Sequence, residues 1–173
     1  MRKKSLVIIL LLACFVGITC FLVNKIVERQ SQNEEIKLTK EYLPKFEFYQ
    51  LDSAIYLSTS IKKNIPLIII HFNTECEHCQ AEVQLISQNI KVFKNAQIIM
   101  VAPNAPSEIN SFMEQYGIKQ HSKINVLWDK YYHFIDWFGH SPFPSVYIYN
   151  KGQHLVKEYH GEVKIEALTK YLN

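Results

Sequence analysis

The chain is poor in glycine and in clustered charge. Only five of its 173 residues are glycine, and its formal net charge of +3 comes from lysines that are scattered along the sequence. It has no glycine-rich loop of the kind that cradles phosphates. It also lacks the dense basic stripe that nucleic-acid binding requires. We therefore expect no nucleic-acid partner, and the length favours a single globular domain.

Cysteine is also scarce, because the whole chain holds four. Cys14 and Cys20 lie in an apolar run near the N-terminus, where they act most simply as small apolar residues. Cys76 and Cys79 stand alone in the remainder, three residues apart in the stretch "HFNTECEHCQAEVQLI". A disulfide-rich scaffold is excluded by this count, and a structural zinc site commonly draws on two such pairs. The single pair is therefore the main candidate for chemistry.

The N-terminus carries the only long hydrophobic run. Three basic residues, Arg2 to Lys4, precede the uncharged segment Leu6 to Val23, whose 18 residues would span roughly 27 Å as a helix. This is longer than a signal-peptide core, so residues 1–27 are predicted to be an uncleaved signal anchor. A lipoprotein signal at "LLAC" and cleavage at another site are the alternatives. All three place the chain from about residue 28 outside the cytosol, on the periplasmic side in a bacterium.

The rest of the chain predicts a polar tether and one α/β domain. Residues 28–40 are polar without a clear apolar period, which indicates a tether or a helical continuation of the anchor. From residue 41 to 173, apolar strand-like runs alternate with amphipathic helical patterns. This alternation predicts a central mixed β-sheet flanked by helices. Strands are expected within 45–51, 54–59, 66–72, 96–102, 124–129, 144–150 and 153–160, and helices within 73–93, 107–117, 130–139 and 164–172.

The cysteine pair is predicted to sit where the buried strand "PLIIIHF" gives way to a helix capped by Asn73 or Thr74. The first turn of a helix stabilises a thiolate through its free N–H groups and its dipole. Cys76 would then attack a partner's disulfide, and Cys79, one turn deeper, would resolve the mixed disulfide.

Three neighbours are expected to tune the redox potential of this pair. A protonated His78 would stabilise the thiolate, whereas Glu75 and Glu77 would oppose it by repulsion. Because the signs oppose one another, the sequence does not rank the potential.

Two other uses of the pair stay open at this point. A structural disulfide would close a very small loop and remove little chain entropy. A soft ion such as copper(I) could be held by Cys76, Cys79 and His78, with His71 as a more remote ligand. Covalent haem attachment is excluded because Gln80, not histidine, follows the second cysteine.

The region from about Tyr42 to Leu172 resembles the membrane-anchored TlpA-like (redoxin/AhpC-TSA) group of thioredoxin-fold proteins. The resemblance rests on "PLIIIHFNTECEHCQAE", Asp129, "FPSVYIYNKGQ" and "EYHG". It implies a thioredoxin-like fold with an N-terminal strand extension and an N-terminal transmembrane helix. It also implies thiol–disulfide exchange without a bound cofactor or metal. The expected partners are extracytoplasmic protein disulfides or thiols, a transmembrane or extracytoplasmic thiol reductant, and the membrane itself through residues 6–23.

The resemblance also assigns roles to individual residues. Cys76 would be the nucleophile and Cys79 the resolving thiol, while Glu82, three residues further, would accept the resolving thiol's proton. Pro144 matches a cis-proline that faces the disulfide, which would leave the backbone of Phe143 free to bind a substrate strand. The alternatives without a functional role are a solvated surface position for Glu82 and an ordinary trans bond at Pro144.

Departures from the family pattern bear on partner choice more than on fold. Glu75 stands where the family usually has tryptophan, and Gln84 replaces a frequent helix proline. The peroxidase branch needs a threonine three residues before its cysteine, where this chain has Asn73. The cysteine pair and the resemblance together predict a tethered thiol–disulfide oxidoreductase, and the resemblance implies that it acts as a reductant. A non-catalytic thioredoxin-fold module that delivers copper(I) is the alternative.

Overall fold

The computed structural model describes residues 2–172, with the side chains of residues 2–7, 10 and 120 outside that description. The chain separates into two compact units, residues 1–36 and 37–173. One long helix, α1 (Arg2–Glu41), makes up the first unit and continues through the stretch expected to be a polar tether. Within the described residues, Leu11–Glu41 is long and apolar enough to cross a membrane, a test that a signal sequence also passes.

The second unit is built on a seven-stranded mixed sheet with the order β2-β1-β5-β4-β3-β6-β7. β3, β4 and β5 run parallel to one another, β6 is antiparallel to β3, and both edges are antiparallel pairs. The strands are β1 (Glu47–Tyr49), β2 (Ile55–Leu57), β3 (Leu67–His71), β4 (Gln97–Ala102), β5 (Ile124–Trp128), β6 (Ser145–Tyr149) and β7 (Leu155–His160).

The central position of β3 follows from its continuous apolar run. All five residues of β3 are buried, and Ile69 pairs with Ile99 of β4 on one side and Tyr147 of β6 on the other. Because successive side chains point to opposite faces, Ile68 and Ile70 enter one core while Leu67 and Ile69 enter the other. A strand buried on both faces needs this composition, and the sheet forms around it.

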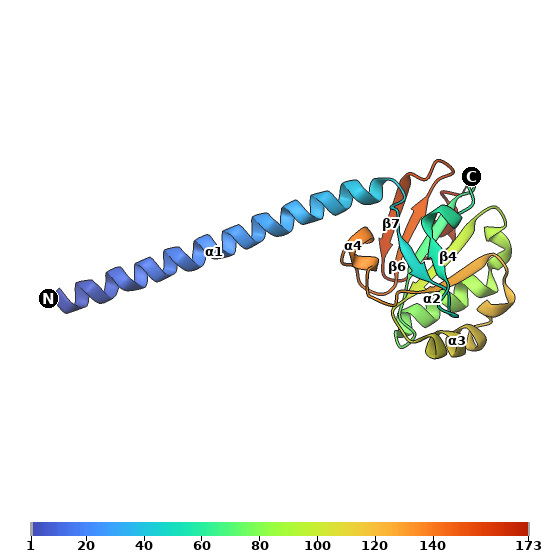
Figure 1. Ribbon diagram of the computed structural model, residues 1–173, viewed down its shortest axis with the longest axis horizontal. Helices are drawn as coiled ribbons and strands as arrows, with labels where there is room; N and C mark the ends of the chain where they lie inside the picture. The colour runs from blue at the N-terminus through green and yellow to red at the C-terminus, as the bar shows by residue number, and fades with distance from the viewer. Residues whose placement is uncertain (1, 173) are drawn as a thin grey trace. The chain divides into compact units, whose positions relative to one another are not determined.

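Helices cover the two faces of the sheet unequally. Residues of α2, α3 and α5 pack into the core that contains Ile70, and residues of α4 pack into the core that contains Ile69. Figure 1 shows α4 apart from α2 and α3, across the sheet. The helices are α2 (Glu77–Gln88), α3 (Pro106–Gln115), α4 (Phe134–Phe138) and α5 (Ile165–Thr169), with 3-10 turns at Ser58–Ser60, Ile90–Phe93 and Ile118–Gln120.

The ends of α2 differ from the sequence-based expectation. Asn73 and Thr74 do not cap it, because the Asn73 side chain accepts the backbone N–H of Glu75 and forms a local turn before the helix. The helix begins at Glu77 with Cys76 as its N-cap. It ends at Gln88 rather than near Phe93, since the Asn89 side-chain amide donates to the Leu85 carbonyl and a 3-10 turn follows.

The cysteine pair lies at one pole of the sheet, where the parallel strands end. The parallel strands β3, β4 and β5 end at His71, Ala102 and Trp128, and the cysteine pair follows the first of these. The loops after β3 and β4 are joined at this pole by a hydrogen bond of 3.1 Å from the Thr74 N–H to the Asn104 side chain. The turn that carries Cys76 is therefore held by a neighbouring loop as well as by its own residues.

Candidate active site

Cys76 occupies the N-cap of α2 with its side chain half-buried. Its Sγ accepts the backbone N–H of Cys79 at 3.4 Å, so the sulfur takes the place of the usual capping oxygen. The Cys76 thiol in turn donates to the carbonyl of Phe143 at 3.7 Å. The sulfur thus lies between a helix N-terminus, which favours negative charge, and a segment far away in the sequence.

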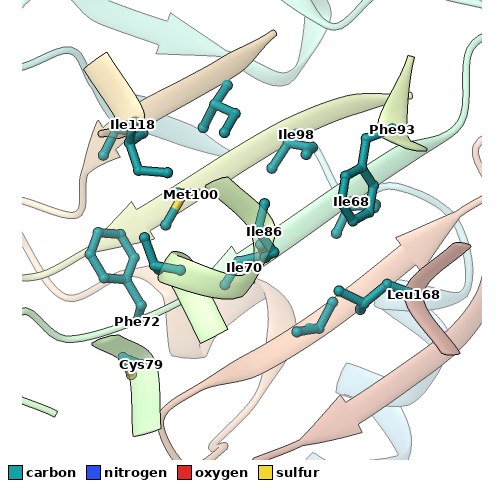
Figure 2. Close-up of a cluster of buried hydrophobic side chains, with 14 of the residues drawn as sticks. Ile68, Ile70, Phe72, Cys79, Ile86, Phe93, Ile98, Met100, Ile118 and Leu168 are labelled. Carbon is teal, nitrogen blue, oxygen red and sulfur yellow. The ribbon is translucent and has the colours of Figure 1, made fainter. Parts of the chain in front are cut away.

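Cys79 lies one helical turn deeper and is fully buried. Figure 2 shows it at one end of the apolar cluster that also holds Phe72, Ile86 and Met100. Burial strongly raises the pKa of the Cys79 thiol, and the hydrogen bond and charge of Cys76 and the charge of Glu82 raise it further. The structure contains the two cysteines as free thiols. Cys79 is therefore a protonated thiol, shielded from solvent, in this state.

Glu82 is buried within the apolar face of α2, with only 2% of its surface exposed. Neither of its carboxylate oxygens has a hydrogen-bond partner in the described structure. Burial raises the pKa of Glu82 to about 8, and the charge of Glu162 adds to the effect. A helix normally keeps a glutamate in solvent, so a buried, unpaired carboxyl one turn below a buried thiol suits proton transfer.

The Phe143–Pro144 peptide bond is cis, the isomer that the resemblance implies. Pro144 directly precedes β6, whose first residue Ser145 pairs with His71 at the end of β3. This pairing brings the carbonyl of Phe143 next to the Cys76 sulfur. The structure therefore brings Phe143 and Pro144 together with the cysteine pair, as expected from the sequence.

The acidic and basic neighbours of the pair are exposed. Glu75 and Glu77 flank Cys76 in solvent, and the His78 imidazole Nδ1 contacts a carboxylate oxygen of Glu162. Glu162 was not identified from the sequence, because it lies 84 residues from His78 and no spacing links the two. Its position directly after "EYHG" was the only available signal.

His71 faces the side of the sheet opposite to Cys79. Its ring stacks on Phe134 at a centroid distance of 3.8 Å, and burial lowers the pKa of His71 to about 3. Its Nδ1 has no hydrogen-bond partner. The structure thus places this more remote copper ligand away from the buried sulfur. Within the described residues, no group of three or more His, Cys, Asp or Glu side chains could hold a metal ion.

Asp129 is buried and serves the fold beside the site. Its two carboxylate oxygens accept the backbone N–H groups of His133 at 2.8 Å and Phe134 at 3.1 Å, where α4 begins. Burial raises the pKa of Asp129, and these two hydrogen bonds oppose that shift. Asp129 therefore fixes the start of α4 beside the sheet.

The family follows from a sequence comparison. Residues 39–158, more than half of the chain, match the model of the AhpC/TSA family. The chain belongs to the AhpC/TSA family. No curated protein shows significant sequence similarity to it. The match includes Cys76, Cys79, Glu82 and the Phe143–Pro144 bond, so the whole candidate site lies inside the AhpC/TSA region.

Solved structures show the fold of this AhpC/TSA chain. DsbF of Mycobacterium tuberculosis is 18% identical with a TM-score of 0.64, covering 74% of this chain and 92% of that chain. A putative thiol:disulfide interchange protein DsbE from Chlorobium tepidum is 14% identical with a TM-score of 0.64, covering 76% and 93%.

A putative thioredoxin from Neisseria meningitidis is 20% identical with a TM-score of 0.62, covering 76% of this chain and 86% of that chain. At these identities the three likenesses show the fold alone. They confirm the thioredoxin-like α/β fold that the sequence predicts for this member of the AhpC/TSA family.

Proposed function

We propose that the protein is a thiol–disulfide oxidoreductase that exchanges disulfides with partner proteins through Cys76 and Cys79. One observation carries the proposal: a half-buried sulfur caps a helix directly above a fully buried thiol, and a buried carboxyl without a partner lies one turn below that thiol. A purely structural pair has no use for the unpaired Glu82, whose burial costs free energy.

The first step of the proposed reaction uses the accessible sulfur. The Cys76 thiolate attacks one sulfur of a partner's disulfide, forming a mixed disulfide as the partner's second sulfur leaves and takes a proton from water. The N–H of Cys79, 3.4 Å from the Cys76 Sγ, and the positive end of the α2 dipole stabilise the attacking charge.

The second step uses the buried groups. In its ionised form, whose population rises as the pH approaches its pKa of about 8, Glu82 accepts the proton of Cys79. Cys79 then attacks the Cys76 sulfur, which forms the Cys76–Cys79 disulfide and releases the reduced partner as a thiolate. Part of the raised pKa of Cys79 comes from its hydrogen bond to Cys76 and from the charge on Cys76. Both contributions end once Cys76 is held in the mixed disulfide, so Cys79 ionises more easily when it is needed.

Phe143 and Pro144 are proposed to bind the partner's backbone. The carbonyl of Phe143 lies 3.7 Å from the Cys76 Sγ, so a partner strand laid along this segment would bring its disulfide to the attacking sulfur. Strand addition of this kind recognises backbone rather than sequence, which suits an enzyme with several protein substrates.

The reductive direction is supported by the charges around Cys76. The His78 imidazole contacts the Glu162 carboxylate, which offsets a charge on His78, whereas Glu75 and Glu77 are exposed beside the sulfur and form no ion pair within the described residues. Negative charge disfavours the thiolate and hence the reduced form, which makes the dithiol a better electron donor. A transmembrane or extracytoplasmic thiol reductant would then restore the pair, and no bound cofactor takes part.

The proposed location is the outer side of a membrane. We assign residues 1–27 to a signal anchor, residues 28–40 to a polar tether and residues 41–173 to the thioredoxin-like domain. Support comes from the uncharged run within α1 and from the basic residues that precede it. Protein disulfides are common outside the cytosol, where such an enzyme would find its extracytoplasmic partners.

Trapping of mixed disulfides tests this function. In the full-length protein, Cys79→Ser should accumulate covalent partners because the resolving thiol is missing, whereas the matched Cys76→Ser variant should trap few. Non-reducing gels and mass spectrometry would report the adducts and identify the partners. Absence of any adduct with Cys79→Ser, together with tight copper(I) binding by the unmodified protein, would instead favour a copper-delivery module.

A further inference from the structure

A polar hollow of about 740 Å³ lies at the pole of the domain opposite the cysteine pair. It is lined by residues at the starts of the parallel strands, including Pro66 before β3, Gln97 of β4 and Lys123 before β5. Lys151, in the turn after the antiparallel strand β6, closes it. Figure 2 shows Phe93, next to this pole, far from Cys79 within the same core.

All the charged side chains that line the hollow are positive. Lys62, Lys94, Lys123 and Lys151 line it together with asparagine and glutamine side chains, and no lining residue is acidic. None of the four lysines forms an ion pair in the described part of the chain. A smaller adjoining hollow shares Lys94 and adds Lys170. We call the larger cavity the lysine hollow.

Four like charges around one concave space repel one another unless an anion neutralises them. The lysine ammonium groups and the amide NH2 groups donate hydrogen bonds that phosphate oxygens accept, and the amide carbonyls bring no negative charge that would repel them. The side chain of Lys123 is held in place, because its ammonium donates to the Lys94 carbonyl at 3.0 Å and so connects the segments before β5 and β4. We propose that the lysine hollow is a binding site for phosphate groups.

The position of the hollow points to the source of that phosphate. Residues near the start of the second unit lie close to the turn that carries Lys151. Tyr42 forms a β-bridge with His154, and the Leu43 N–H donates to the Gln153 carbonyl at 2.9 Å, two residues from Lys151. The chain therefore enters the domain at the pole of the hollow. With the proposed N-terminal anchor, the domain is tethered to a bilayer, so we infer that lipid headgroups are the source of the phosphate. This assignment of the source rests on the anchor, whereas the phosphate site itself does not.

Lysine modification tests the site in the full-length protein. The chain is placed in nanodiscs of neutral phosphatidylcholine or of the same lipid with about one-third phosphatidylglycerol, and acylation rates are followed by mass spectrometry. A third arm adds pyrophosphate to the neutral nanodiscs. We expect anionic lipid to slow acylation of Lys62, Lys94, Lys123 and Lys151 severalfold, while Lys157, on β7, keeps its rate.

The double variant Lys94→Gln/Lys151→Gln gives the matched comparison. Each lysine near an anionic surface contributes about fivefold in affinity, so this variant should bind the anionic lipid roughly 25-fold more weakly and lose the severalfold protection of its remaining lysines. The control variant Lys130→Gln/Lys157→Gln removes the same charge elsewhere and should leave protection unchanged.

The three arms separate the possible outcomes. Protection by phosphatidylglycerol supports the headgroup as source, and protection by pyrophosphate alone supports the site with a soluble phosphate as its ligand. Equal acylation rates in all three arms, or equal loss in both double variants, would overturn the proposal. Alkylation of Cys76, measured in the same samples, reports on the proposed redox function independently.

Discussion

Replacing Glu82 by glutamine should change how the stability of the domain depends on pH. Burial raises the pKa of Glu82 from 4.5 to about 8, so the carboxyl is protonated in the folded state and ionised in the unfolded state between these values. The unfolded state binds fewer protons in this window, and stability is therefore lost as the pH rises through it. Above about pH 8 the full loss is roughly 5 kcal/mol, at 1.36 kcal/mol for each pH unit.

Between pH 5 and pH 8 the expected loss is roughly 3 to 4 kcal/mol, a large part of the stability of a small domain. Glu82→Gln keeps the shape of the side chain and removes the charge. Urea unfolding of the reduced full-length protein, followed by the fluorescence of Trp128 and Trp137, would measure the free energy of unfolding at each pH. The free energy of unfolding of the variant should rise steadily relative to that of the unmodified protein as the pH increases over this range.

The matched control is Glu77→Gln on the same helix, because Glu77 is exposed. Its curve of unfolding free energy against pH should run parallel to that of the unmodified protein. If Glu82→Gln also gave a parallel curve, Glu82 would be titrating as a solvated carboxylate, and both its buried state and its role as proton acceptor would be refuted. In the trapping assay, Glu82→Gln should prolong the life of the mixed disulfide by about 100-fold or more.

Substitutions of two further buried residues, His71 and Asp129, test the other buried ionisable groups near the end of the sheet. The pKa of His71 is about 3 in the folded state and 6.5 in the unfolded state, so the unmodified domain loses about 3 kcal/mol of stability as the pH falls from 7 to 4. His71→Phe should remove this loss and stabilise the domain at low pH. An unchanged midpoint of acid unfolding would contradict this. Asp129→Ala should cost roughly 1 to 3 kcal/mol by leaving the N–H groups at the start of α4 unpaired, and Asp129→Asn should cost less, as thermal unfolding would show. Equal losses in the two Asp129 variants would mean that hydrogen bonding is not the cause.

The architecture could be predicted from the sequence because its strongest signals are local. The run "PLIIIHF" has the length and composition that only a doubly buried strand requires, and it became β3. The spacing of Cys79, Val83 and Ile86 gave the buried face of α2. Glu82 lies one turn past Cys79, which allowed a buried position but left a solvated one open, and the structure shows that it is buried.

The remaining features depend on contacts between distant segments. The cap of α2 was misplaced because the Asn73 side chain serves the preceding turn, and a pattern does not show which of two local hydrogen bonds forms. Glu162 approaches His78 only after β7 is laid beside β6. The lysine hollow is assembled from four separate loops, and no window of sequence contains more than a fraction of it.

The use of sulfur as the cap of α2 links the chemistry of the pair to the order of the helix. A sulfur in a disulfide is a weaker hydrogen-bond acceptor than a thiolate, so formation of the mixed disulfide weakens the bond from the Cys79 N–H to the Cys76 Sγ. The first turn of α2 is then less firmly held at the step in which Cys79 must approach Cys76. We expect amide hydrogen exchange at Cys79 to quicken when Cys76 is alkylated, and unchanged exchange would count against this coupling. The reacting sulfur of Cys76 is thus also the cap of α2: its oxidation weakens the hydrogen bond to the Cys79 N–H, and its reduction restores that bond.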